Sequence, residues 1–396
     1  MTTMLSRNGR LPPIYVLLAL ALCTLFFYYR SSIGISPTLG GSGDLAGAAN
    51  ATLGFGGLYV VSGPGSPRRQ HLEQAAAVTE LRLTIPEQVA WSDGDIKDFR
   101  WPNETESRIG TGSAKAWLSH HLVLKAFLDS GLETALIFED DVDWDIRLRT
   151  QQIPRAQKAA QSLTSTSSSW GKQYPWGRPS EWDLFYLGHC GDYFNDLNDH
   201  IGVGHHHPSD LEETPHVVFE DPSMPYRTDI HPFTASLFTA LGVPEQHRLL
   251  HASKWPLCTF GYAVTRTAAQ KILSDVAPQK EDIARNLVAY DAALLSGCRD
   301  KNKPWSIRCY TVQPEFFHHM EGKSIIALQE ETKDHHVFRP PVDVAGLEQV
   351  EYRHETSNIG CGFWSGEFYY LDEKELNYLR REVGRKGRCL KKGRDA

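Results

Sequence analysis

A strand that runs directly into a row of carboxylates constrains this chain more than any other stretch. Residues 135–138 (Ala-Leu-Ile-Phe) are continuously apolar, as is typical of a strand buried on both faces. The carboxylates that follow are Glu139, Asp140, Asp141, Asp143 and Asp145. Adjacent anions repel one another, so the fold must supply something that compensates for their charge.

Strand-like and helix-like segments alternate around this stretch. Apolar and β-branched runs predict strands at 58–61, 87–91, 134–139 and 182–190, and helical spacing predicts helices at 70–81 and 113–130, the second ending at Gly131. This alternation is the signature of an α/β sheet. In an open sheet of that class, functional groups gather at the carboxyl ends of the strands, where the carboxylates stand.

The N-terminal part predicts a membrane anchor. No charge occurs from Leu11 to Tyr29, and a bilayer-spanning helix needs roughly 20 apolar residues. Arg7 and Arg10 precede this run, which favours a cytoplasmic segment 1–10 and a body outside the cytosol. A cleaved signal peptide is the alternative, with Ala-Gly-Ala-Ala at 46–49 as a cleavage site. Residues 30–57, which are rich in Gly, Ser and Ala, predict a flexible stem.

Other features agree with a single-pass type II protein of the endoplasmic reticulum or Golgi. Asn50-Ala-Thr52 and Asn103-Glu-Thr105 are glycosylation acceptor patterns. Six cysteines follow the apolar run, and their even number predicts one or two disulfides. These are Cys190, Cys258, Cys298, Cys309, Cys361 and Cys389. The net charge of -7, with both signs mixed along the chain, excludes a nucleic-acid footprint.

Two insertions and a C-terminal extension are predicted. Residues 150–180 read as an exposed loop, and 192–255 include His-His-His-Pro-Ser-Asp at 205–210, a solvated loop or a metal-binding run. The extension 331–396 ends in a basic tail, predicted to be solvated, with contact to anionic glycan or lipid as the alternative. Core packing is the better interpretation of the aromatic residues in 358–371.

Several explanations of the acidic run can be compared. A calcium loop is excluded because Ile146 stands where that loop needs Gly and Gln152 where it needs Glu. A phosphatase nucleophile motif fails because Trp144 follows Asp143. A helix N-cap cluster stays open. The remaining compensation is a divalent cation that carries an anionic ligand, held by Glu139 and Asp141, which point to one side if the strand continues.

The acidic run also resembles the motif of glycosyltransferase family 25, the lipooligosaccharide and collagen galactosyltransferases. The resemblance covers roughly residues 58–326, and its motifs occur in the order of that family. They are LYVVSGPGSPRRQHL, VAWSDG, SAKAWLSHHLVL, ALIFEDDV, WDLFYLGHC, FGYAVTRTAAQKIL, YDAALLSGC and QPEFFHHMEGKSII. One departure is TGSAKAW, where bacterial members often have Gly-Glu-x-Gly-Cys before Leu-Ser-His.

The resemblance implies a GT-A type fold and the transfer of a sugar, by default galactose, from a UDP-sugar to a glycan or glycoprotein acceptor with inversion. It implies that Glu139 and Asp141 bind Mn²⁺ or Mg²⁺, which stabilises the leaving diphosphate. In such folds a C-terminal histidine often completes the metal shell, and His318 or His319 stands in the right part of the chain. A partly buried pair of loop histidines is the alternative.

Further roles follow from the same resemblance. Asp93 would bind the uracil or ribose, Arg68 and Arg69 the diphosphate, and Asp291 would be the general base, with Asp143 as the second candidate. The other residues assigned to the nucleotide site are Ser119, His120 and Asp140. Each has a structural alternative: a turn for Asp93, surface arginines, a core histidine for His120, and helix capping for Asp291.

Two other classes of function stay open. One is a non-catalytic carbohydrate-binding or scaffold protein with the same fold, because a fold does not fix a function. The other is a luminal hydrolase that uses the acids as a metal site, although the motifs do not supply the scattered His and Asp ligands that two metals need.

Overall fold

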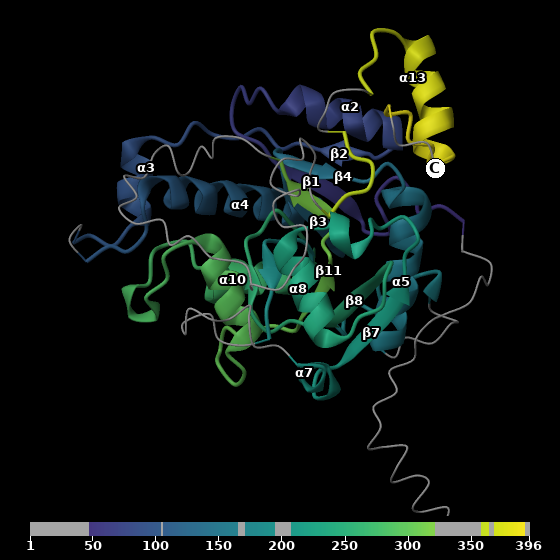
Figure 1. The fold of residues 1–396 in the computed structure, drawn as a ribbon. Helices are drawn as coiled ribbons and strands as arrows, with labels where there is room; N and C mark the ends of the chain where they lie inside the picture. Colours follow the sequence, from purple (N-terminus) through teal and green to yellow (C-terminus); the bar gives the residue numbers. More distant parts are fainter. Residues whose placement is uncertain are drawn as a thin grey trace, which may run out of the picture. The chain divides into compact units, whose positions relative to one another are not determined.

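An eight-stranded mixed sheet lies at the centre of the computed structural model, which describes residues 47–103, 106–164, 171–194, 207–320, 358–363 and 368–392 (Figure 1). The strand order is β2-β1-β3-β10-β5-β11-β8-β7. Strand β1 pairs in parallel with β2 and β3, whereas β10 runs antiparallel to both β3 and β5. The strands are β1 (Gly57–Val61), β2 (Leu83–Thr84), β3 (Thr134–Glu139), β5 (Leu184–Gly188), β7 (His216–Glu220), β8 (His247–Ala252), β10 (Gly261–Thr265) and β11 (Cys309–Gln313).

Helices cover both faces of the sheet, which confirms the predicted α/β class. One face packs against α2 (Arg69–Thr79) and α5 (Ile153–Leu163), and the other against α3 (Asp93–Phe99), α4 (Thr111–Asp129), α9 (Arg266–Lys271) and α10 (Tyr290–Arg299). In β3, Leu136 and Phe138 join the first core, while Ala135 and Ile137 join the second. A strand covered on both faces needs apolar residues at every position, which explains the continuous run at 135–138.

Further elements lie between these strands and helices. They are β4 (Val142–Trp144), β6 (Gly191–Asp192), β9 (Pro256–Leu257), β12 (Phe317–His319), α7 (Ser209–Glu212), α8 (Pro232–Leu241), η1 (Leu148–Gln152), η3 (Arg227–Asp229), η4 (Ile272–Val276) and η5 (Ile283–Arg285). Two two-stranded ribbons matter for the site: β12 pairs with β4, and β6 pairs with β9.

The predicted stem is wrong for its last residues. Ala49, Leu53 and Phe55 are buried in the core, and the Asn50 side chain accepts hydrogen bonds from the backbone N–H groups of Thr52 and Gly54. Because the segment is rich in Gly, its few buried apolar residues were not recognised from the sequence. The predicted anchor at 11–29 lies outside the described residues, and within them no helix is long and apolar enough to cross a membrane.

The predicted second strand is wrong as well. Residues 87–91 have no regular structure, and the strand that pairs with β1 is the two-residue β2. Ser92 instead caps α3: its hydroxyl accepts from the Asp95 N–H at 3.2 Å, and the Asp95 carboxylate accepts from the Ser92 N–H at 2.8 Å. This capping box explains the Ser-Asp-Gly-Asp sequence, which places Asp93 in the first turn of α3.

Both predicted insertions contribute to the fold. The first contains α5, which packs on the sheet, so the exposed loop predicted for 150–180 is wrong there; residues 165–170 lie outside the description. The second supplies β7 and β8, two strands of the main sheet, while His205 and His206 lie outside the description.

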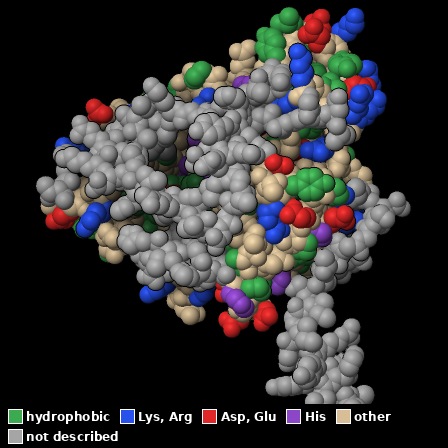
Figure 2. All heavy atoms as spheres, viewed as in Figure 1, with side chains coloured by type: hydrophobic (Ala, Val, Ile, Leu, Met, Phe, Trp, Pro, Cys, Tyr) green, Lys and Arg blue, Asp and Glu red, His purple; other side chains and the backbone are tan. Residues whose placement is uncertain are grey.

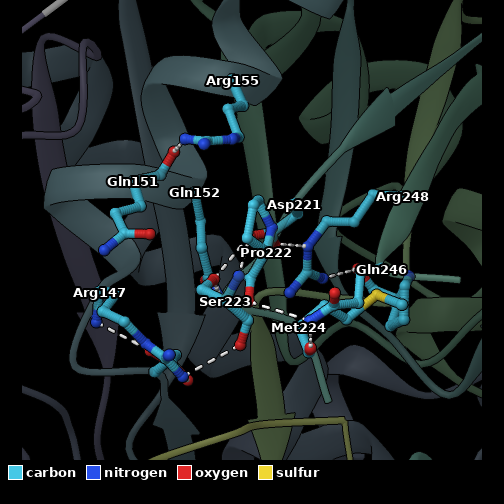
Figure 3. A network of polar contacts seen from close by, with 12 residues as sticks. Arg147, Gln151, Gln152, Arg155, Asp221, Pro222, Ser223, Met224, Gln246 and Arg248 are labelled. Atoms are coloured by element: carbon cyan, nitrogen blue, oxygen red, sulfur yellow. Dashed lines mark hydrogen bonds and ion pairs between the residues drawn. The ribbon is translucent and has the colours of Figure 1, made fainter. Parts of the chain in front are cut away.

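A buried polar network joins these two regions (Figure 3). Arg248 of β8 contacts Asp221 at 2.5 Å, and both side chains are buried. Ser223 accepts at its hydroxyl from the Gln152 amide at 2.9 Å and at its carbonyl from Arg147 at 3.0 Å. Because buried charges and amides need partners, this network fixes η1 against the loop after β7.

The predicted solvated tail is also wrong within the described residues. Helix α13 (Glu373–Leu379) continues into η6 (Arg380–Arg385), which packs on α2, and Leu376, Leu379 and Val383 are buried. Lys, Arg, Asp and Glu side chains gather over this segment (Figure 2). Among the described aromatic residues of 358–371, Phe363 and Phe368 are buried, as predicted, whereas Tyr369 is exposed.

Among the described residues three disulfides form, where one or two were predicted. They join Cys190 to Cys258, Cys298 to Cys309, and Cys361 to Cys389. The third connects the segment 358–363 to the residues that follow η6. The first connects the residue just before β6 to the residue just after β9.

Candidate active site

A cavity of about 630 Å³ opens where β1 and β3 end. Its walls come from the loop after β1, the segment 89–91, α4, the segment 258–260, the start of α10 and the end of β12. Of the residues predicted for the site, the lining includes Arg68, Ser119, His120, Glu139, Asp140, Asp141, Asp291 and His319. The carboxyl edge of the sheet therefore brings together side chains that are up to 251 positions apart in the chain (319 − 68).

Asp141 lies between two basic side chains of this cavity. Its Oδ2 accepts a hydrogen bond from Arg68 Nη1 at 2.7 Å and lies 3.2 Å from His319 Nε2. Burial raises the pKa of Asp141, but the hydrogen bond and charge of His319 and the charge of Arg68 outweigh it and lower that pKa. Asp141 is therefore an anion at neutral pH.

Within the part of the chain that the structure describes, two buried carboxylate oxygens of the cavity have no hydrogen-bond partner: Asp140 Oδ2 and Asp141 Oδ1. Both residues are only 7% exposed. A buried unpaired carboxylate oxygen is costly, and oxygen ligands of this kind are what Mg²⁺ and Mn²⁺ bind. The donor set thus fits a hard divalent cation. Among the described residues, no group of three or more His, Cys, Asp or Glu has the arrangement to hold a metal by itself.

Glu139 has a different environment from Asp141. Its Oε1 lies 3.5 Å from His120 Nε2, and its side chain is 26% exposed. Burial first, and then the neighbouring charge of Asp141, raise the pKa of Glu139 to about 8, although His319 acts in the opposite direction. In the absence of a bound cation, Glu139 is mostly protonated at neutral pH.

An aromatic cluster fixes His120 behind Glu139. His120 Nδ1 lies 3.2 Å from the Tyr262 hydroxyl, which lies 3.0 Å from the Tyr290 hydroxyl. The Tyr290 ring stacks on the imidazole with centroids 4.5 Å apart. Burial lowers the pKa of His120 to about 3, although Asp291 acts in the opposite direction, so the ring is neutral. His120 is therefore a hydrogen-bonding group here and not a permanent cation.

Asp291 follows Tyr290 in the first turn of α10 and lines the same cavity. Its Oδ1 accepts from the Ala292 N–H at 2.8 Å. Burial raises the pKa of Asp291, and the backbone hydrogen bonds only partly offset this effect. A carboxylate with a raised pKa is a better proton acceptor than an ordinary one.

Sequence reasoning missed part of the lining. Trp91, Lys115, Thr259, Phe260 and Tyr290 were not predicted, although all of them face the cavity. The Trp91 indole donates to the Ser119 hydroxyl at 2.9 Å, which ties the segment 89–91 to α4. Trp91 and Tyr290 lie within two positions of the predicted Asp93 and Asp291, so a search of the neighbours of predicted residues would have found them.

Four predicted site residues do not line the cavity: Arg69, Asp93, Asp143 and His318. Arg69 donates to Ser62 and to the Gly63 carbonyl, and Asp93 is exposed in α3.

The other two face the opposite side of the β12–β4 ribbon. His318 pairs with Asp143 and His319 with Val142, so consecutive residues alternate between faces. Asp143 accepts from the Phe363 N–H. His318 contacts Glu315; burial raises the pKa of Glu315, but His318 outweighs it and lowers that pKa to about 2.

A scan of the sequence against protein-family models found no match, and a search of curated proteins found none either.

Proposed function

We propose that this chain is a metal-assisted glycosyltransferase with a GT-A type fold, related to glycosyltransferase family 25. It would transfer a sugar, by default galactose, from a UDP-sugar to a hydroxyl of a glycan or glycoprotein with inversion. The observation that carries the proposal is the pair of partnerless buried oxygens on Asp140 and Asp141, in a cavity that also holds Arg68, His319 and Asp291.

The chain's own residues supply the binding of the donor. Gly63 and Pro64 line the cavity before the start of α2, where a helix N-terminus attracts phosphate. Arg68 adds a guanidinium at the same point. Trp91 and Ser119 bound the part of the cavity between the segment 89–91 and α4, where the nucleoside would fit.

Asp141 and His319, with Asp140 beside them, would hold Mn²⁺ or Mg²⁺. When bound, the cation neutralises the charge that develops on the departing diphosphate. Glu139 contributes a third carboxylate, and His120, which the Tyr262–Tyr290 pair holds in place, lies next to it.

Asp291 is the proposed general base. Its carboxylate takes the proton from the acceptor hydroxyl as that oxygen bonds to the anomeric carbon, and the nucleoside diphosphate leaves with the electron pair of the broken bond. The alternative base, Asp143, faces the C-terminal segment and accepts backbone hydrogen bonds there. The geometry thus favours Asp291.

The setting proposed for this reaction is the lumen of the endoplasmic reticulum or Golgi, with residues 11–29 as the anchor. The three disulfides suit an oxidising compartment.

The test is a titration of the full chain from a eukaryotic host with UDP- and GDP-sugars, with Mn²⁺ or with a chelator. One UDP-sugar is expected to stabilise the protein only with metal, by about 2.7 kcal/mol at roughly 100 times its Kd, and to be slowly hydrolysed. Asp141→Asn is expected to abolish both effects. If no nucleotide sugar binds or turns over with any divalent metal, the proposal is wrong and a carbohydrate-binding role takes its place.

A further inference from the structure

The two arginines at the start of α2 have different partners. Arg69 donates from Nε to the Ser62 hydroxyl at 3.2 Å and from Nη2 to the Gly63 carbonyl at 3.1 Å, so it secures the loop after β1. Arg68 turns the other way. Its Nη1 lies 2.7 Å from Asp141 Oδ2 and 4.0 Å from Asp140 Oδ1. Arg68 is therefore a cation placed on the two aspartates of the proposed metal site.

The guanidinium and a divalent cation would act on two oxygens of the same carboxylate, because Arg68 donates to Asp141 Oδ2 and the oxygen without a hydrogen-bond partner among the described residues is Asp141 Oδ1. A metal ligated by Asp141 would stand about 2.0–2.6 Å from a carboxylate oxygen, and Arg68 already donates to one of these oxygens at 2.7 Å. Two cations that share one partly buried carboxylate repel each other. A divalent cation that arrives alone must therefore displace Arg68 or bind beside it at a cost in affinity.

The same cavity contains a second position where Arg68 can contact an anion. It is the N-cap residue of α2, an 11-residue helix with no acidic residue in its first turn. Gly63 and Pro64 of the preceding loop line the cavity together with Arg68. A diphosphate bound at this helix end would meet the guanidinium, which forms paired hydrogen bonds with phosphate oxygens.

We propose that Arg68 is the counter-cation of Asp141 in the nucleotide-free protein and transfers to the diphosphate when the nucleotide binds. Metal and nucleotide then bind with positive coupling, because the nucleotide removes the competitor of the metal. Coupling of this kind is reciprocal, so the metal tightens nucleotide binding by the same factor. This inference rests on the proposed function for the identity of the anion.

The experiment measures the Kd of Mn²⁺ for the full chain by electron paramagnetic resonance of free Mn²⁺, with and without UDP. In the wild type, UDP is expected to tighten Mn²⁺ binding by roughly 10- to 100-fold. Arg68→Gln is expected to bind Mn²⁺ alone about tenfold tighter than the wild type does, and its coupling to UDP should be smaller. Lys115→Gln is the matched control, because it removes one positive charge from the cavity wall and leaves the Arg68–Asp141 contact intact.

Several outcomes would overturn the inference. If Arg68→Gln binds Mn²⁺ alone no tighter than the wild type does, Arg68 is not a counter-cation. The same conclusion follows if Lys115→Gln gains as much Mn²⁺ affinity as Arg68→Gln. Arg68→Lys, which keeps the charge, should stay close to the wild type in metal-only affinity. Arg68→Met, which also removes the charge, replaces Arg68→Gln if that variant does not fold. A wild type that binds Mn²⁺ but no UDP contradicts the proposed function, whereas tighter Mn²⁺ binding by Arg68→Gln in that experiment still supports the counter-cation role.

Discussion

The two halves of the acidic run 139–145 differ in how their charge is compensated. In the second half, Asp145 accepts hydrogen bonds from the backbone N–H groups of Gly360 and Cys361 at 3.1 and 2.9 Å and pairs with Arg147 at 2.8 Å. Asp143 accepts from the Phe363 N–H at 2.8 Å. In the first half, Asp140 and Asp141 each keep one buried oxygen that no described residue pairs with.

Along seven consecutive residues, this difference separates carboxylates that stabilise the fold from carboxylates that are available to a ligand. Carboxylates with all their hydrogen bonds made are part of the structure, and here they hold a segment that is more than two hundred positions away in the chain. Carboxylates that the chain leaves partly unsatisfied are open to a ligand that completes them. The break between the halves comes at β4, where the chain turns away from the main sheet.

The largest expected effect is the loss of the structural half. Asp145→Ala removes an acceptor of two backbone N–H groups and leaves Arg147 without its ion-pair partner, so we expect about 3–5 kcal/mol less free energy of unfolding. Chemical denaturation measures this loss. Asp93→Ala, at an exposed position of α3, is the control and should change stability by less than about 0.5 kcal/mol. An equally small change in Asp145→Ala would remove the distinction between the halves.

A substitution in the first half of the run should lower turnover strongly and change stability little. Asp141→Asn removes the anion that Arg68 and His319 share, and we expect turnover to fall by about 10²- to 10³-fold, as when a group that stabilises developing charge is lost. The free energy of unfolding should change by less than about 1 kcal/mol, because Arg68 keeps access to solvent. Steady-state kinetics and denaturation on the same preparation compare the two. A variant that unfolds easily would place Asp141 with the structural carboxylates.

The disulfide between Cys361 and Cys389 tests whether the C-terminal segment is a support of the site or part of it. Replacing both cysteines with serine is expected to cost about 2–4 kcal/mol, the usual range for a bridge of this separation, 28 positions. The cavity lining includes none of the described residues 358–363 and 368–392, so the Kd of the nucleotide should change little. Chemical denaturation measures the loss of stability, and a nucleotide titration measures the Kd. A large loss of nucleotide affinity in a folded variant would show that this segment shapes the cavity.

The sequence predicted the framework around the site because that framework depends on local patterns. Continuous apolar runs identified β1, β3 and β5, and helical spacing with Gly131 identified α4. The prediction failed where a short element depends on distant contacts. Residues 87–91 resemble a strand, but β2 is the strand that pairs with β1. The basic tail that begins with η6 was predicted to be solvated, although Val383 is buried in the core that α2 helps to form.

For the site, the sequence predicted which residue types are present and did not predict their contacts. The sequence placed carboxylates at the end of β3, but it did not show that Asp143 and Asp145 cap a C-terminal segment, because their partners are more than two hundred positions away. It likewise could not separate His318 from His319, since that choice depends on the register of β12 with β4. Register and long-range pairing are properties of the folded chain.

The smallest expected effect concerns Glu139, the first carboxylate of the run. Its pKa is about 8 in the folded protein and 4.5 when unperturbed, so between these values the folded state binds more protons and the free energy of unfolding falls as the pH rises. The buried histidines, with pKa values lowered to about 3, act in the opposite direction but only below pH 6.5. Between pH 6.5 and 8 the metal-free wild type should therefore lose about 1 kcal/mol, less than the limiting slope because the side chain is 26% exposed. Glu139→Gln should flatten this dependence of the free energy of unfolding on pH, and the control Asp93→Asn should not. Denaturation at several pH values with a chelator measures both variants. A slope unchanged by Glu139→Gln would mean that Glu139 is ionised throughout, like its neighbour Asp141.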